Sequence, residues 1–182
     1  MKRKGIAFIM VLALSAALFA GCSSKTSQQP AAQTPAKTVG TAVDGNEQNI
    51  EKAAMSLVKA KEEGKYSLVS TEELKSWVDS KKDMVIIDTM PASSFKNGHI
   101  PGAVNAELPK TGMNDVTAEQ KAAFIKLLPA DKNKTVVLYC GFTSCARSDV
   151  GAKIAVELGY KNVYRQPGGI VAWQDAKYTV EK

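Results

Sequence analysis

The sequence predicts an α/β protein with an open, mostly parallel sheet that is covered by helices on both faces. Short apolar runs of strand length alternate along the chain with longer segments of helical periodicity. Two of these runs, Met84–Asp88 and Thr135–Tyr139, are apolar almost throughout, which is typical of strands buried on both faces. In such sheets the ligand site lies beyond the carboxyl ends of the strands, so we expect Asp88 and the residue after Tyr139 to lie at that edge.

Local patterns define the individual elements. Strands are expected at residues 66–69, 84–88, 103–105, 135–139 and 162–164. Ser70 with Glu73 and Thr117 with Gln120 each match a capping box, in which two side chains satisfy backbone N–H groups at a helix start. Further helices are expected over residues 150–158 and around Trp173.

A separate amphipathic helix is predicted at residues 47–64, ahead of the first strand. Its apolar residues recur at the spacing that places them on one helix face. These residues are Ile50, Ala53, Ala54, Leu57 and Val58. We expect this stripe to pack on the domain that follows, while a partner-binding role for the helix stays open.

The N-terminus predicts export. A basic Lys-Arg-Lys segment precedes a nearly unbroken apolar run from Ile6 to Ala20, as in secretory signal peptides. Small residues then lead to Cys22, and this arrangement resembles the lipobox of bacterial lipoproteins. The resemblance implies a signal peptide at residues 1–21, acylation of Cys22 and a membrane anchor facing the extracytoplasmic side. An uncleaved anchor, or cleavage without acylation, stays open.

Residues 22–46 are expected to form a flexible tether, because they contain almost no large apolar side chains that could offset the entropy of ordering them. The whole chain of 182 residues has a net charge of +6, to which Lys2, Arg3 and Lys4 contribute three. The rest is nearly balanced and has no basic stripe with interleaved aromatic residues. The composition therefore gives no indication of nucleic-acid binding.

A loop that follows the most apolar strand and precedes a helix carries the main chemical signal. Its residues are Cys140, Gly141, Phe142, Thr143, Ser144, Cys145, Ala146, Arg147 and Ser148. Backbone N–H groups in a tight loop can converge on an anion, and the helix N-terminus behind them carries partial positive charge. We therefore expect a Cys140 thiolate with a pKa below the ordinary value of about 8.5, with Arg147 adding charge. On spacing alone, an inert buried cysteine fits equally well.

Several segments resemble the rhodanese family, in the family's order along the chain. The similar segments are Ile86–Asp88, Phe95–Asn105, Val136–Cys140, Leu158–Val163 and Gly168–Trp173. The second contains the Gly-His-Ile-Pro-Gly-Ala turn, and the third matches the strand that presents the family's catalytic cysteine. The resemblance implies a rhodanese-like open parallel sheet of about five strands with helices on both faces, and we assign this domain to residues 65–182.

The resemblance implies a sulfurtransferase or sulfur carrier. Cys140 would attack a small sulfane-sulfur donor, become a persulfide and pass the sulfur to a thiol or cyanide acceptor. The loop amides would stabilise the charged sulfur. No cofactor and no metal is implied. Asp88 would support the active edge, and His99 is expected to hold its turn rather than to catalyse.

Three departures from the family pattern concern the site. The family's arginine two residues after the aspartate is Met90 here, and the acid before the phenylalanine is Ser94. Ser148 lies eight residues after Cys140, so the loop is longer than the six-residue loop of common sulfurtransferases. The longer loop leaves the size of the substrate open.

Three alternatives stay open. The first is a non-catalytic binding module on a lipid anchor. The second is a dithiol redox protein in which Cys145 resolves a species formed on Cys140, as an oxidising compartment would allow. The third is phosphatase or arsenate chemistry, since related phosphatases clamp phosphate with a Cys-x5-Arg loop and Arg147 lies one position later than that pattern requires.

Overall fold

The computed structural model describes residues 46–182. The predicted signal peptide, the acylation site Cys22 and the tether up to residue 45 lie outside the described residues. Within residues 46–182, none of the helices combines the length and the apolar character that a bilayer crossing requires.

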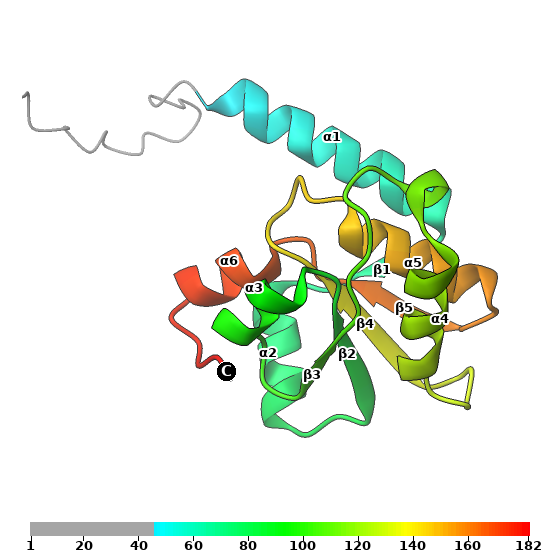
Figure 1. Cartoon of the computed structure of the whole chain (residues 1–182). Helices are drawn as coiled ribbons and strands as arrows, with labels where there is room; N and C mark the ends of the chain where they lie inside the picture. The colour runs from blue at the N-terminus through cyan, green and yellow to red at the C-terminus, as the bar shows by residue number, and fades with distance from the viewer. Residues whose placement is uncertain (1–45) are drawn as a thin grey trace, which may run out of the picture. The chain divides into compact units, whose positions relative to one another are not determined.

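A five-stranded parallel sheet forms the centre of the described chain (Figure 1). Its strands are β1 (Ser67–Leu68), β2 (Met84–Asp88), β3 (Ala103–Asn105), β4 (Thr135–Tyr139) and β5 (Asn162–Arg165). They lie in the order β1-β5-β4-β2-β3, and every neighbouring pair is parallel. The predicted fold class is thereby confirmed.

Helices cover both faces of this sheet (Figure 1). They are α1 (Glu47–Gly64), α2 (Thr71–Asp79), α3 (Ala92–Asn97), α4 (Ala118–Leu127), α5 (Arg147–Glu157) and α6 (Gly169–Asp175), with a 3-10 turn at Met113–Asp115. Successive strand residues face opposite sides of a sheet, so neighbours in β4 enter different cores. Leu138 packs in one core with Phe124 of α4, whereas Tyr139 packs in the other with Leu74 of α2 and Trp173 of α6.

The two predicted capping boxes differ in the structure. At the start of α4 both bonds are present, since the Thr117 side chain accepts from the Gln120 N–H and the Gln120 side chain accepts from the Thr117 N–H. At the start of α2 the Ser70 hydroxyl accepts from the Glu73 N–H at 3.0 Å, but the reciprocal bond is missing. The box at Ser70 is therefore an ordinary N-cap, and the prediction of a full box there is wrong.

The helix α1 spans the range that the periodicity predicts, but its apolar stripe packs less than expected. Ile50, Ala54 and Val58 are exposed, and the other two members of the stripe are only half-buried. Gly64, at the C-terminal end of α1, is buried and lies against Lys153 of α5. The expectation that the whole stripe is covered is wrong, because α1 is buried only at this end.

The start of α6 fixes the start of the cysteine loop. The Ile170 N–H donates to the Cys140 carbonyl at 2.9 Å, and the Val171 N–H donates to the Gly141 carbonyl at 3.0 Å. Gly169 has φ +63°, and a Cβ at this position would lie 2.4 Å from the Cys140 carbonyl oxygen. Only a glycine allows α6 to approach the loop this closely.

This close approach predicts a large effect of Gly169→Ala. We expect a loss of at least about 3 kcal/mol in the free energy of unfolding, measured by denaturant titration, because strain at positive φ and a backbone clash act together. Gly159→Ala is the matched control, since Gly159 also has positive φ but a Cβ there meets no atom within 4 Å. This control should lose about 1–2 kcal/mol, and equal losses in the two variants would contradict the account.

Candidate active site

Two predicted site residues lie at the carboxyl edge of the sheet. Cys140 follows the last residue of β4, and Asp88 is the last residue of β2, where it pairs in register with Tyr139. In the sheet, β2 and β4 are neighbours. The chain runs from β2 to β3 on one side of this pair and from β4 to β5 on the other side, so the two connections leave the edge in opposite directions. Such a point is where open α/β sheets bind their ligands.

The Cys140 thiol is enclosed by hydrogen-bond acceptors. The side chain is 1% exposed. Its Sγ donates to the Cys145 carbonyl oxygen at 3.2 Å and lies 3.2 Å from the Ser148 hydroxyl oxygen. The Phe142 carbonyl oxygen is 4.0 Å away. Carbonyl oxygens stabilise the protonated form of a thiol, because they accept its proton and repel a negative charge.

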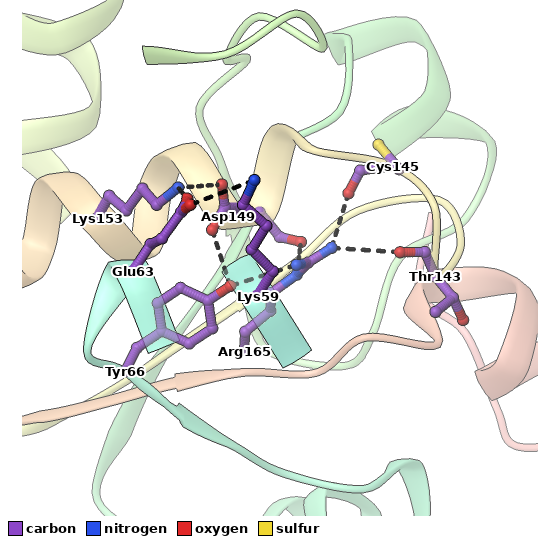
Figure 2. A network of polar contacts seen from close by, with 9 residues as sticks. Lys59, Glu63, Tyr66, Thr143, Cys145, Asp149, Lys153 and Arg165 are labelled. Carbon is purple, nitrogen blue, oxygen red and sulfur yellow. Dashed lines mark hydrogen bonds and ion pairs between the residues drawn. The ribbon is translucent and has the colours of Figure 1, made fainter. Parts of the chain in front are cut away.

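A buried arginine holds the loop around this thiol. Arg165, the last residue of β5, is 3% exposed. Its Nε donates to the Ser148 hydroxyl at 2.9 Å, and its Nη2 donates to the carbonyl oxygens of Cys145 at 2.9 Å and Thr143 at 3.4 Å (Figure 2). Its Nη1 donates to the Tyr66 hydroxyl at 3.3 Å. Arg165 was not among the site residues that the sequence predicts, although it directly follows the predicted strand at residues 162–164.

These contacts close into a ring that we call the thiol ring: the Arg165 guanidinium, the Ser148 hydroxyl, the Cys140 thiol and the Cys145 carbonyl. Since the Cys140 thiol gives its proton to the Cys145 carbonyl, the Ser148 hydroxyl is left to donate to Cys140 Sγ. Each member thereby has a partner inside the ring.

A chain of polar contacts links the thiol ring to α1 (Figure 2). The Tyr66 hydroxyl accepts from Arg165 and donates to Asp149 Oδ1 at 2.8 Å. Asp149 pairs with Lys153 at 3.0 Å, and Lys153 pairs with Glu63 of α1 at 3.6 Å. Burial raises the pKa of Tyr66, so its hydroxyl stays neutral and can donate. The carboxylate of Asp149 is thus the nearest negative charge along this chain of contacts to the buried guanidinium.

The pKa values of the two loop cysteines are shifted in opposite directions. The pKa of Cys140 is raised, first by the hydrogen bond that it shares with Cys145 and then by burial. The pKa of Cys145 is lowered to about 5, by the hydrogen bond from Cys140 and by the backbone N–H groups of Arg147 and Gly141. The expectation of a lowered pKa at Cys140 is therefore wrong. The N–H groups of Arg147 and Gly141 lower the pKa of Cys145 instead. The Ser148 N–H lowers the pKa of Cys140, but by less than the hydrogen bond with Cys145 and burial raise it.

The remaining loop residues contribute in different ways. Arg147 donates from Nη1 to the Leu108 carbonyl and lies 3.5 Å from the Glu107 carboxylate, so its guanidinium is engaged by protein groups. Its charge still lowers the pKa of Cys145. Phe142 is 56% exposed at the tip of the loop, and Ser144 is exposed beside it. An Arg147 held in this way is poorly prepared for the bidentate phosphate clamp of a phosphatase.

Asp88 ends β2, two residues before Met90, which stands where the family has an arginine. Its side chain is fully buried, and Oδ1 accepts from the Met90 N–H at 2.8 Å. Oδ2 is buried with no hydrogen bond to any group in residues 46–182. Burial raises the pKa of Asp88 by more than the Met90 N–H and the Tyr139 hydroxyl lower it. The carboxyl group is therefore easier to protonate than an ordinary aspartate.

The contacts of His99 belong to its turn. Nδ1 lies 3.1 Å from the Phe95 carbonyl oxygen, and the ring stacks on the Phe95 ring with centroids 3.8 Å apart. The backbone of His99 pairs with that of Glu181. These contacts agree with the turn-holding role that the sequence suggests.

The comparison with protein families identifies the domain. The model of the rhodanese-like domain matches residues 70–176, which include both strands of the candidate site and the whole cysteine loop. The chain belongs to the rhodanese-like domain family. The predicted resemblance to this family is confirmed for these residues.

Curated relatives cover different shares of this rhodanese-like chain. It is 34% identical over 95 residues to the thiosulfate sulfurtransferase GlpE of Shewanella oneidensis, covering 52% of this chain and 80% of that protein. It is 32% identical over 109 residues to the adenylyltransferase and sulfurtransferase UBA4 of Candida albicans. That match covers 59% of this chain but spans only 23% of the length of the relative.

A solved structure shares the fold. The polysulfide-sulfur transferase homodimer of Wolinella succinogenes superposes with a TM-score of 0.53 at 18% sequence identity. The match covers 76% of this chain and 93% of the other. At this identity the similarity shows a common rhodanese-like fold and nothing further.

The raised pKa of Asp88 predicts a pH effect on stability. A carboxyl group with a folded pKa above its unfolded value stabilises the fold below the unfolded value, near 3.9, and this contribution is lost as pH rises through the folded pKa. The side chain at position 88 cannot ionise in the variant Asp88→Asn. As pH rises from about 3.9 to the folded pKa, the free energy of unfolding of the wild-type protein should therefore fall relative to that of the variant, by at most about 1.4 kcal/mol per pH unit. Urea titrations at several pH values measure this difference. A difference that grows in favour of wild type as pH rises would contradict the assignment.

Proposed function

We propose that this rhodanese-like protein is a sulfurtransferase or sulfur carrier, which holds sulfane sulfur as a cysteine persulfide in the loop between β4 and α5. The observation that carries the proposal is a pair of free thiols in this loop, of which Cys140 donates to the Cys145 carbonyl oxygen at 3.2 Å and Cys145 has a lowered pKa. A thiolate is the form of cysteine that attacks sulfur. The name of the GlpE relative, a thiosulfate sulfurtransferase, supports the same chemistry.

The reaction would proceed by two displacements. The thiolate attacks the outer sulfur of a small donor such as thiosulfate, and the bond between that sulfur and the leaving sulfite breaks. A thiol or cyanide acceptor then attacks the persulfide and releases the thiolate. We assign the persulfide to Cys140, which directly follows β4, and give Cys145 the role of a resolving thiol. The N–H groups at the start of α5 would stabilise the anionic sulfur in both steps.

A dithiol redox role is the second candidate. It is favoured by the presence of two free cysteines in one loop, where Cys140 Sγ lies 3.2 Å from the carbonyl oxygen of Cys145. Oxidation would join Cys140 and Cys145 in a disulfide, and a thiol reductant would restore the pair.

We further propose that the domain works at the extracytoplasmic side of a membrane, held there by an acylated Cys22. The support is the sequence of residues 1–22, where a basic segment, an apolar run and small residues precede the cysteine. A tether at residues 22–46 would let the domain reach small donors and thiol acceptors in the cell envelope.

The proposed function predicts uptake of one sulfur atom. The full chain with Cys22→Ala, purified in detergent, should gain the mass of one sulfur atom on incubation with thiosulfate or polysulfide, and cyanide should remove it. The variant that also carries Cys140→Ser and Cys145→Ser is the control and should gain nothing. Intact-protein mass spectrometry measures the adduct. A chain that stays unmodified, or that forms only a Cys140–Cys145 disulfide, would contradict a sulfurtransferase.

A further inference from the structure

We infer that one exposed face of helix α1 binds the same face of a second copy of this chain, with the two helices antiparallel. This α1 face consists of Glu47, Ile50, Ala54, Val58 and Lys61. The inference stands apart from the sulfur chemistry, so self-association and sulfur uptake are tested separately. Three features carry it: the exposure of the face, the order of its residues and its position relative to the domain.

The α1 face is not covered by the domain, and α1 lies on the outside of the described chain (Figure 1). Ile50 is 55% exposed and Val58 is 47% exposed, and Ala54 between them is exposed as well. Residues four apart are neighbours on a helix surface, so these three side chains form one continuous apolar row. Glu47 and Lys61, at the two ends of the row, are exposed and form no ion pair with any group in residues 46–182.

The order of the residues is symmetric about Ala54. Ile50 and Val58 lie four residues before and after Ala54, and Glu47 and Lys61 lie seven residues before and after it. At 3.6 residues per turn, all four therefore lie on the same side of the helix as Ala54. Reversal of the helix direction exchanges the two β-branched residues and the two opposite charges.

This symmetry makes the α1 face complementary to itself. In an antiparallel pair, Ile50 of one copy lies opposite Val58 of the other, and Glu47 lies opposite Lys61 at both ends of the contact. The small side chain of Ala54 lies at the two-fold axis, where it lets the two backbones approach closely. A parallel pair would instead place like charges against each other at both ends.

The charge of α1 favours a second copy over a lipid surface. Helices that lie on membranes are rich in Lys and Arg on their polar side. The helix α1 carries four acidic and three basic residues, so it lacks such a side. The apolar row is also short, and its charged ends require a partner with charges in the opposite order.

The domain leaves room for this pairing. The covered side of α1 contains Ala53, Leu57 and Ala60, which are half-buried, and Gly64, which is buried. At about 100° per residue, the α1 face lies roughly a quarter turn around the helix from that side. A two-fold axis through Ala54 therefore carries the second domain to the opposite side of the helix pair, where it does not collide with the first.

Disulfide crosslinking at the expected axis tests the pairing. The full chain with Cys22→Ala and Ala54→Cys, in detergent at about 50 µM, should form a disulfide-linked dimer with copper phenanthroline as oxidant. It should do so at least about tenfold faster than the same chain with Ser56→Cys, since Ser56 is also exposed but lies on nearly the opposite side of α1. The parent chain measures any background from Cys140 and Cys145. Equal rates for the two variants would overturn the inference.

Charge exchange tests the antiparallel direction. Glu47→Lys or Lys61→Glu, each added to Ala54→Cys, should slow crosslinking at least about threefold, because like charges then meet at both ends of the pair. The two changes together should restore the rate to within about twofold. Both oppose the helix dipole, so a more stable helix would not explain the restoration. Lys52→Glu, at an exposed position outside the α1 face, is the control and should leave the rate unchanged. Failure of the double exchange to restore the rate would overturn the antiparallel pairing.

A different occupant of the α1 face would give a different result. A bimane label on the chain with Ala54→Cys reports contact with lipid through a blue shift of its emission. We expect no shift when vesicles of phosphatidylcholine and phosphatidylglycerol are added, since the second copy occupies the face. A blue shift together with absence of the disulfide-linked dimer would place the face on a lipid surface and overturn the inference.

Discussion

The arrangement of the site depends on one buried guanidinium. Transfer of a charge from water into a protein interior costs several kcal/mol, which only hydrogen bonds and a counter-charge can offset. Arg165 meets this requirement with four acceptors, of which two are carbonyl oxygens of the cysteine loop and one is the hydroxyl that contacts Cys140. The loop therefore adopts a conformation in which its carbonyl oxygens and the Ser148 hydroxyl accept hydrogen bonds from Arg165. That conformation in turn decides which sulfur faces N–H groups and which faces carbonyl oxygens.

Segments far apart in the sequence have to meet before this ring can close. Parallel register brings the end of β5 beside the end of β4, and α6 then fixes the carbonyls of Cys140 and Gly141 from the other side of the sheet. Tyr66, just before β1, completes the acceptors of Arg165 and connects it to a carboxylate on α5. Loss of sheet register would therefore alter the chemistry of the loop as well as the stability of the fold.

Local patterns predict most of the fold. Apolar runs define the strands, and the Thr117–Gln120 capping box marks the start of α4 correctly, because each depends on neighbours within a few residues. The exposed stripe of α1 was not predictable, since periodicity shows that residues share a face but not that another element covers it.

The sequence predicts where the candidate site lies in the fold but not the hydrogen bonds around its two cysteines. The order strand, loop, helix places Cys140 and Cys145 at the carboxyl edge of the sheet, and the family match supports that placement. The sequence could not show which sulfur the amides face, because that depends on the direction of the Cys145 carbonyl. That direction is set by Arg165, which lies 20 residues away along the chain.

The central claim is that the thiol ring holds the Cys140 thiol protonated in the resting protein, so that Cys145 is the more acidic of the two thiols. The most direct test is the rate of iodoacetamide alkylation of each cysteine in the native chain from pH 4 to pH 9, followed by peptide mass. The account predicts that Cys145 reacts at a rate that levels off above about pH 6, while Cys140 reacts more slowly than Cys145 throughout this range. Faster alkylation of Cys140 than of Cys145 in the folded protein at neutral pH would contradict it.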